Sequence, residues 1–192
     1  MHTWEEYYKK HSKRKPRNQL SRSISYCDKK NMALDLGAGN LIESKFLIEN
    51  GFKRVVAIDS SVKTIDFLNS SLKEKITLLI MPFQEYQFPL NTFDLVNAQY
   101  SLPFYGKEYF KDFFEKIKNS LGQNAIFVGQ FFGINDSWNT KESDLIFHTK
   151  EDVLLLFKDF NIIEFLEEKK DGTTAMGDNK YWHVFHVIAQ YR

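Results

Sequence analysis

The sequence predicts an α/β fold, a doubly wound and mostly parallel sheet of seven strands with one antiparallel strand near the C-terminus. Three observations lead to this prediction. From residue 32 onward, apolar runs of strand length alternate with helical segments, and the first strand ends in a glycine-rich turn. The last two strand-like runs are joined by a loop with no room for a crossover helix, so these two strands should be antiparallel.

The first part of this alternation contains two strand–helix units. Residues 32–36 form a short apolar run that ends at a glycine, as buried strands do, and residues 41–50 predict a helix that stops at Gly51. A second strand is expected at residues 54–58 and a second helix at residues 62–72. Consecutive units of this kind place parallel strands in one sheet.

The rest of the chain predicts three more strands, two helices and the closing strand pair. Thr149 is followed three residues later by Asp152, the pattern of a helix N-cap, which marks the start of the helix expected at residues 150–157. The antiparallel pair is joined by a loop rich in turn-forming residues. The expected strands are 76–81, 93–97, 125–130, 162–168 and 181–190, and the expected helices are 109–119 and 150–157.

At 192 residues, the chain is long enough for one sizeable core, and it has no repeat, low-complexity tract or linker at which to divide it. We therefore expect a single domain overall. Within it, residues 1–30 form an N-terminal cap segment that is aromatic and basic, and residues 31–192 form the ligand-binding part. The 18 Phe residues predict a core built from rings.

Positive charge gathers in the N-terminal cap segment, where nine Lys or Arg residues face three acidic ones, although the whole chain has a net charge of only +1. Such a run is either a solvated segment or a surface that binds anions or nucleic acid. Because a nucleic-acid-binding domain usually has a basic excess overall, a nucleic-acid partner is not expected.

Cys27 is the single cysteine, which excludes an internal disulfide and a Cys-based zinc site and fits a reducing compartment. No run approaches the roughly 20 apolar residues of a membrane span, and the first residues are not those of a signal peptide. His183 and His186 fall on opposite faces of a predicted strand, so they cannot bind one metal together. We expect a cytoplasmic protein without a membrane partner or a metal, and the sequence carries no signal for an oligomeric state.

The first strand leads into the turn Asp35-Leu36-Gly37-Ala38-Gly39-Asn40. Two closely spaced glycines let the backbone bend sharply and approach a ligand, while the following helix presents free N–H groups. Asp59 lies 20 residues past Gly39, at the end of the second strand, where a carboxylate accepts hydrogen bonds from the hydroxyls of a ribose. The spacing favours a nucleoside-type ligand.

A dinucleotide oxidoreductase is another possible interpretation of this turn. Its fingerprint needs a third Gly or Ala three residues after the second glycine, where this chain has Ile42. Asp35 would repel a pyrophosphate, whereas it attracts a cationic ligand. The residues therefore favour a nucleoside with a positive centre.

In these residues the sequence resembles the class I methyltransferases that use S-adenosylmethionine (SAM), whose first motif reads acid-hydrophobic-Gly-x-Gly. It is similar, over segments that span almost the whole chain, to small bacterial methyltransferases of the tellurite-resistance and thiopurine branch. This resemblance implies a Rossmann-like fold that binds SAM in residues 31–192. The segments that carry it are Trp4-Glu5-Glu6-Tyr7-Tyr8, Arg14-Lys15-Pro16-Arg17, residues 97–104, 129–133 and 136–138, and Trp182-His183-Val184-Phe185-His186.

Two positions depart from the family pattern. Leu41 stands where a third glycine is common, and Asn40 with Glu43 is expected to compensate by capping the next helix. Pro82 stands where an acid commonly binds the adenine amino group, so the adenine is expected to rely on the ring of Phe83 and on backbone groups. The cofactor-binding residues implied by the resemblance are Arg17, Gly37, Ala38, Gly39, Asp59, Ser60, Pro82, Phe83 and Asn97.

Asn97 ends the fourth strand, at the edge where ligands bind in open α/β sheets, and is expected near the methionine part of SAM or the methyl acceptor. Tyr100 and Phe104, in the following loop, either line the acceptor pocket or pack in the core. Arg17 suits the α-carboxylate of SAM, because a guanidinium binds a carboxylate through two parallel hydrogen bonds.

The aromatic residues Trp4, Tyr7 and Tyr8 form either a cap over the cofactor, favoured by attraction between rings and a sulfonium, or a plain amphipathic helix. His148, beside a helix start, is either a base at the sheet edge or a capping or surface residue. An acceptor that is already nucleophilic needs no base, since the enzyme mainly aligns the reacting atoms. The sequence therefore assigns no catalytic residue.

We predict a SAM-dependent methyltransferase that acts on a small nucleophilic acceptor. The alternatives are a nucleic-acid or protein methyltransferase and a non-catalytic SAM-binding module. Amino-methylating nucleic-acid enzymes often carry Asn/Asp-Pro-Pro-aromatic after the fourth strand, where this chain has Asn97-Ala98-Gln99-Tyr100. This difference disfavours a nucleic-acid acceptor.

Overall fold

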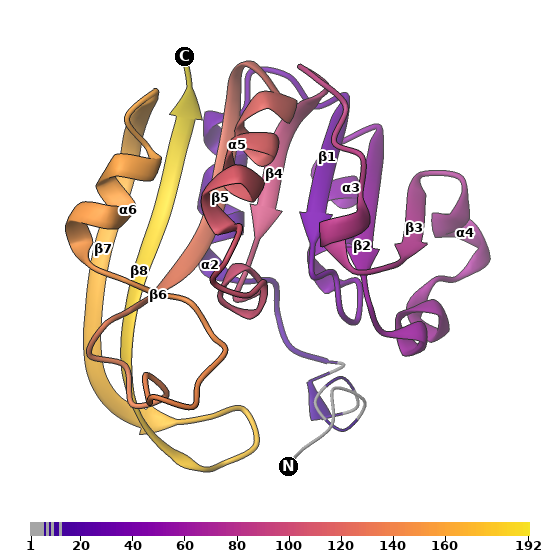
Figure 1. Cartoon of the computed structure of the whole chain (residues 1–192). Coiled ribbons are helices and arrows are strands. Elements are labelled where there is room, and N and C mark those ends of the chain that lie inside the picture. Colours follow the sequence, from indigo (N-terminus) through magenta and orange to yellow (C-terminus); the bar gives the residue numbers. More distant parts are fainter. Residues whose placement is uncertain (1–5, 7, 9, 12) are drawn as a thin grey trace.

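The computed structural model describes residues 6, 8, 10, 11 and 13–192. Its strands form one sheet in the order β3-β2-β1-β4-β5-β8-β7, with the short β6 beside β5, and Figure 1 shows helices on both faces of this sheet. β8 runs antiparallel to β5 and β7, whereas the other pairings are parallel. The predicted doubly wound sheet with one reversed strand near the C-terminus is confirmed.

The strands occupy the apolar runs of the sequence, and most extend beyond the predicted bounds. An eighth strand was not predicted: β6 has only two residues, which pair with Phe132 and Gly133, and so short a strand leaves no periodic signal. The strands are β1 (Met32–Leu36), β2 (Arg54–Asp59), β3 (Ile76–Ile80), β4 (Phe93–Ala98), β5 (Leu121–Gly133), β6 (Phe147–His148), β7 (Phe160–Thr173) and β8 (Asn179–Tyr191).

The described α-helices are short, and within the described ranges none is both long and apolar enough to cross a bilayer. They are α2 (Asn18–Ser23), α3 (Ile42–Glu49), α4 (Ser70–Lys73), α5 (Phe110–Ser120) and α6 (Lys150–Leu156). The continuous helix predicted for residues 62–72 is wrong, because a 3-10 helix at Val62–Phe67 is followed by α4. β-Branched residues weaken the helix here, and Asn69 starts a new one by accepting a hydrogen bond from the N–H of Leu72.

The predicted helix starts have different outcomes. Thr149 and Asp152 form a complete capping box at the start of α6, as expected. At α3, however, the predicted cap is wrong: the N-cap is Leu41, with a left-handed φ of 59° and no side-chain cap bond. Asn40 instead donates from Nδ2 to the carbonyl of His11 at 3.0 Å, and Glu43 binds Arg14. Both side chains therefore hold the N-terminal segment.

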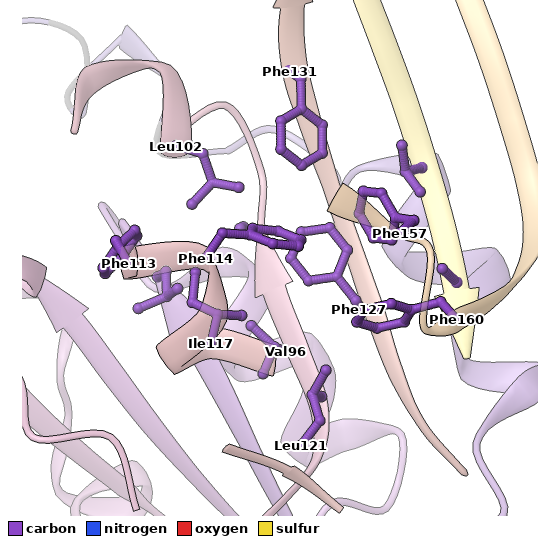
Figure 2. Close-up of a cluster of buried hydrophobic side chains, with 14 of the residues drawn as sticks. Val96, Leu102, Phe113, Phe114, Ile117, Leu121, Phe127, Phe131, Phe157 and Phe160 are labelled. Atoms are coloured by element: carbon purple, nitrogen blue, oxygen red, sulfur yellow. The ribbon is translucent and has the colours of Figure 1, made fainter. Parts of the chain in front are cut away.

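Each face of the sheet carries a buried apolar cluster. The cluster under α5 and α6 is rich in Phe, including Phe113, and Figure 2 shows the rings of Phe114, Phe127 and Phe157 packed against one another. The other cluster lies under α2 and α3 and contains Leu20 and other aliphatic side chains. Because removing a buried Phe side chain typically costs about 3–5 kcal/mol, this ring cluster contributes strongly to the stability of the sheet that carries the strand ends described next.

Candidate cofactor and acceptor site

The glycine turn after β1 has a backbone that requires small residues. Gly37 and Gly39 have positive φ angles of 74° and 51°. The N–H groups of Gly37 and Ala38 both donate to the carbonyl of Ile58, at 2.9 and 3.0 Å. A Cβ on Gly37 would lie 2.5 Å from the Cβ of Ser101. The turn is therefore held between β2 and the loop after β4, and a side chain at Gly37 would force them apart.

Asp59 ends β2 with its carboxylate beside this turn. Its Oδ2 accepts a hydrogen bond from the N–H of Gly39 at 2.7 Å, and its Oδ1 accepts one from the N–H of Ser61 at 2.9 Å. The side chain is buried, whereas the neighbouring Ser60 is exposed. The structure thus brings together the two sequence features, glycine turn and acid, that point to a nucleoside.

Tyr8 of the N-terminal segment covers the same carboxylate. Its hydroxyl lies 3.1 and 3.2 Å from the two oxygens of Asp59, and a Cβ on Gly39 would meet its ring at 3.1 Å. Trp4 and Tyr7, the other predicted cap residues, lie outside the described residues. A ribose offers the same kind of hydroxyl donor, so the phenol of Tyr8 stands in for the group that a nucleoside would present to Asp59.

An ion pair that the sequence did not predict holds the segment after Tyr8 against α3. The guanidinium of Arg14 donates two hydrogen bonds of 2.5 Å to the carboxylate of Glu43. The backbone N–H of Arg17 adds a third at 3.3 Å. Glu43 is only 4% exposed, which makes this a buried carboxylate with a bidentate partner. The N-terminal run contains many basic residues, so sequence spacing cannot select Arg14 as the partner.

Asp35 lies in β1 directly before the turn and is 1% exposed. Its carboxylate accepts hydrogen bonds from Oγ of Ser44 at 2.5 Å and from Nδ2 of Asn97 at 2.7 Å. Burial raises the pKa of Asp35 to about 7, and the negative charge of Glu43 acts in the same direction. A cationic ligand nearby would favour the ionised form. This carboxyl group therefore matches a ligand with a positive centre.

Four buried polar atoms near this edge have no hydrogen-bond partner within the described part of the chain: Oδ1 of Asn97, Oγ of Ser101, Nε2 of Gln99 and Nε of Arg17. Buried polar groups normally have a partner, so unpaired ones indicate that a ligand or water completes the set. Asn97 binds Asp35, and Ser101 contacts Gly37. Donors and acceptors thus gather beside a carboxyl group and a glycine turn, and this set of residues fits SAM.

The guanidinium group of Arg17 lies over the ring of Tyr100, beside this set. The guanidinium carbon of Arg17 lies 4.3 Å from the centroid of the Tyr100 ring. The backbone of Tyr100 has a left-handed φ of 56°, which turns the chain sharply after β4. Phe104, 39% exposed, adjoins the same ring group. We call this group the aromatic wall; neighbouring ring centroids in it lie 5.7–6.3 Å apart, and its members are Tyr100, Phe104, Phe132, Trp138 and Trp182.

Lys180 packs against the aromatic wall at Trp138 and Trp182. Its ammonium group pairs with the carboxylate of Asp136, and both side chains are fully buried. The same ammonium lies 4.0 Å from the ring centroid of Trp138 and 4.4 Å from that of Trp182. Burial lowers the pKa of Lys180, against the raising effect of Asp136. The pair ties the loop after β5 to the β7–β8 hairpin.

Three buried glutamines connect α2 to the sheet, and sequence reasoning singled out none of them. Nε2 of Gln130 donates to Oε1 of Gln19 and, at 2.7 Å, to Oε1 of Gln99. Oε1 of Gln19 also lies 3.2 Å from Nδ1 of His186. The available signal was Gln130 itself, a polar residue within the apolar run of β5.

The expected adenine-side residues lie after β3. Pro82 is exposed and precedes a 3-10 turn, Phe83–Glu85. The ring of Phe83 packs against Phe113 and Tyr105, with centroids 5.5 and 6.0 Å apart. The faces of the Phe83 ring therefore contribute to packing against α5, and contact with an adenine stays a prediction for this segment.

His148 and His183 have structural partners. His148 packs against Phe110 and Phe131 in the ring cluster, with centroids 5.1 and 5.6 Å away, and burial lowers its pKa to about 4. His183 accepts from the N–H of Asn135 at Nδ1 and lies 3.0 Å from Oε1 of Glu167 at Nε2. Across the residues that the structure describes, no three metal-binding side chains gather.

A family model described as a methyltransferase domain matches residues 34–129. No curated protein matches the chain in sequence.

Several solved structures share this fold at low sequence identity. TehB from Haemophilus influenzae superposes with a TM-score of 0.77 at 16% identity, over 97% of this chain and 66% of that one, so the chain spans just under two thirds of TehB. A 1,6-didemethyltoxoflavin-N1-methyltransferase from Burkholderia thailandensis, with 1,6-didemethyltoxoflavin and S-adenosylhomocysteine bound, gives 0.64 at 14% identity over 91% and 78% of the two chains. The N-methyltransferase NodS from Bradyrhizobium japonicum, in complex with S-adenosylhomocysteine, gives 0.67 at 14% identity over 90% and 84%.

Proposed function

Because this chain belongs to the family of methyltransferase domains, which use SAM as cofactor, we propose that it methylates a small nucleophilic acceptor. The observation that supports this most is one edge of the sheet, where the glycine turn, the carboxylate of Asp59 and the unpartnered atoms of Asn97 and Ser101 lie together.

In this proposal the cofactor lies along the ends of β1 and β2. Gly37, Ala38 and Gly39 approach it with their backbone, and Asp59 binds the ribose hydroxyls. Asp35 and Asn97 face its cationic end, and Arg17 binds its carboxylate. Ser60, Pro82 and Phe83 lie on the adenine side. When bound, SAM would supply a methyl group carried on a positively charged sulfur, and the sulfur would become a neutral thioether once the methyl group is transferred.

The proposed acceptor site lies between residues 97–104 and 131–138, against the aromatic wall. Ring faces bind flat molecules and attract positive charge, so this surface aligns the acceptor and tolerates the charge of the cofactor. The small molecule bound to the Burkholderia thailandensis enzyme supports the same acceptor class by analogy.

We further propose that residues 1–30 close over the cofactor as a cap. In support, Tyr8 contacts Asp59 at the end of β2, and Arg14 contacts Glu43 in the first turn of α3. A cytoplasmic location agrees with Cys27, whose thiol is half-buried and whose pKa burial raises to about 12, an unreactive group.

Calorimetry with SAM, S-adenosylhomocysteine and NAD(H) tests the cofactor part of the proposal. Binding of NAD(H) without binding of SAM would overturn it. The acceptor class is tested by incubating the protein and labelled SAM with metabolite extracts and, in parallel, with purified protein and RNA fractions. Label in a macromolecular fraction alone would replace the small acceptor, and tight SAM binding without any labelled product would point to a non-catalytic module.

A further inference from the structure

The hydrogen bonds around His186 define which nitrogen of its ring carries the proton. The N–H of Tyr100 can only donate, and it donates to Oε1 of Gln130 at 3.0 Å. The amide of Gln130 is thereby oriented, with its NH₂ group toward the oxygens of Gln19 and Gln99. The oxygen of Gln19 then faces Nδ1 of His186 at 3.2 Å.

An amide oxygen only accepts hydrogen bonds, so Nδ1 of His186 must be the protonated nitrogen. A neutral ring with its proton on Nδ1 has a lone pair on Nε2. The side chain is 14% exposed, and its Nε2 is buried with no hydrogen-bond partner in the described residues. His186 therefore presents a buried proton acceptor, oriented by Gln19 through its other nitrogen.

This lone pair lies beside the proposed acceptor site. The ring of His186 stands edge-on to that of Tyr100, with centroids 6.5 Å apart and an interplanar angle of 81°. Its three charged neighbours come from two segments: Glu168 and Lys170 lie on β7, and Arg17 lies before α2. Burial lowers the pKa of His186, and Lys170 and Arg17 act in the same direction, whereas Glu168 opposes them. The ring is therefore neutral near pH 7, the form that accepts a proton.

We propose that Nε2 of His186 accepts the proton of the methyl acceptor, and that the acceptor is a small planar molecule with a hydroxyl or thiol group. The inference rests on the proposed small-acceptor function. The O–H or S–H bond breaks as its proton passes to Nε2, and the freed electron pair forms the new bond to the methyl carbon. The bond from that carbon to sulfur breaks with its electron pair left on sulfur, and the imidazolium later releases the proton to water.

Glu168 explains how the imidazolium would be tolerated. Its Oε1 lies 3.8 Å from Nε2 of His186, too far for a hydrogen bond to the neutral ring but near enough to stabilise the charged one. The carboxylate is 30% exposed, so it also connects the ring to solvent. His148 and His183 lack this arrangement, because one is packed among rings and the other has partners at both nitrogens.

The state of the ring is tested directly by two-bond ¹H–¹⁵N correlation spectroscopy on the full chain labelled at histidine, with His186→Gln to assign the signal. We expect a neutral ring with the proton on Nδ1 at pH 7, and a titration midpoint below that of ordinary histidine. A proton on Nε2, or a charged ring at pH 7, would overturn the proposal. Glu168→Gln should lower the midpoint further without changing the tautomer.

The contact is tested with the S-adenosylhomocysteine complex and two matched probes. Addition of 4-methylphenol should shift the Nε2 resonance, whereas 4-methylanisole, the same ring without a proton to donate, should not. No shift with 4-methylphenol, or equal shifts with both, would overturn the inference.

Turnover provides a third readout. With 4-methylphenol as acceptor, which is un-ionised at pH 7, His186→Gln, whose amide can still accept a hydrogen bond, should lower kcat by about a hundredfold or more with KM little changed. An unchanged kcat would contradict the proposal. If the wild-type protein methylates no small molecule, the proposed function fails, while the spectra still decide the state and contacts of His186 independently.

Discussion

The hydroxyl of Tyr8 lies 3.1 and 3.2 Å from the two carboxylate oxygens of Asp59, although 51 positions separate these residues in the chain. This carboxylate is also the proposed partner of the ribose. If Asp59 binds the ribose as proposed, Tyr8 and the cofactor compete for one carboxylate, and the phenol gives up its bonds when the cofactor binds.

Tyr8→Phe keeps the ring and removes the competing hydroxyl. We expect SAM affinity to rise by about tenfold, because a hydrogen bond to a charged group contributes about 1.5–3 kcal/mol that the free protein loses on binding. Calorimetry measures the change. Tyr26→Phe is a matched control, since its hydroxyl lies 3.5 Å from Glu164, away from the cofactor edge. A lower affinity of Tyr8→Phe would mean that the hydroxyl contacts the ligand.

Asp59→Ala should weaken SAM binding by about ten- to a hundredfold, because it removes charged hydrogen bonds worth about 1.5–3 kcal/mol. Asp94→Ala is the control: Asp94 accepts from the N–H groups of Asn31 and Met32 at 2.6 and 3.2 Å, at the opposite end of β1, so its loss affects stability and leaves SAM affinity unchanged. Equal affinities of Asp59→Ala and wild type would exclude Asp59 from the ribose site.

Asp35 predicts a pH dependence of stability. Its folded-state pKa of about 7 is above the value of about 3.9 for an unfolded Asp. The stability contributed by the protonated form is present at low pH and is lost as the pH rises, so Asp35 lowers the free energy of unfolding steadily between about pH 4 and 7. Urea unfolding of wild type and Asp35→Asn over this interval isolates the effect. A constant difference between the two proteins would contradict it.

The same group predicts that SAM binding releases a proton. A cationic ligand favours ionised Asp35, so binding near pH 7 should drive the proton off and affinity should increase with pH up to about 8. Calorimetry in buffers of different ionisation enthalpy counts the protons released. Asp35→Asn should release fewer, and equal release by the two proteins would assign the proton to another group.

Lys180→Met should destabilise the fold by about 3–5 kcal/mol, because it leaves the buried carboxylate of Asp136 without its cation. Lys170→Met is the control, since Lys170 is 56% exposed in its pair with Glu168 and such surface pairs contribute only about 0–1 kcal/mol. Urea unfolding compares the two. A cost for Lys180→Met no larger than that of the control would show that Asp136 is stabilised by its other hydrogen bonds.

Sequence reasoning succeeded where the signal was local. The glycine turn and Asp59 are tied to the ends of adjacent strands, so a fixed spacing in the chain becomes a fixed distance in the fold. The capping box of Thr149 and Asp152 spans one helical turn, so the start of α6 was equally predictable. The stretch 62–72 failed because its apolar spacing suits a helix, whereas its β-branched residues and Asn69 divide it.

Contacts between distant segments could not be predicted. The pair of Arg14 and Glu43 bridges 29 positions, and the link from Gln19 to His186 bridges 167. Nothing in the sequence distinguishes these partners from other residues of the same type. Leu41 is a further case: its left-handed φ of 59° is one that glycine adopts more easily. Its side chain is nevertheless fully buried, so packing prevails over backbone preference.

The order of these residues along the chain has an evolutionary consequence. Residues 34–129, which match the family model, contain the glycine turn, Asp59 and Asn97. Arg17 and Gln19 precede this region, and Trp182 and His186 follow it. Of the aromatic wall, Phe132, Trp138 and Trp182 follow the matched region, so acceptor choice can diversify there while the glycine turn and Asp59 continue to bind the same methyl donor. A library randomised at Phe132, Trp138 and Trp182 should yield new acceptor specificities without loss of SAM affinity, whereas one that also includes Arg17 should lower that affinity.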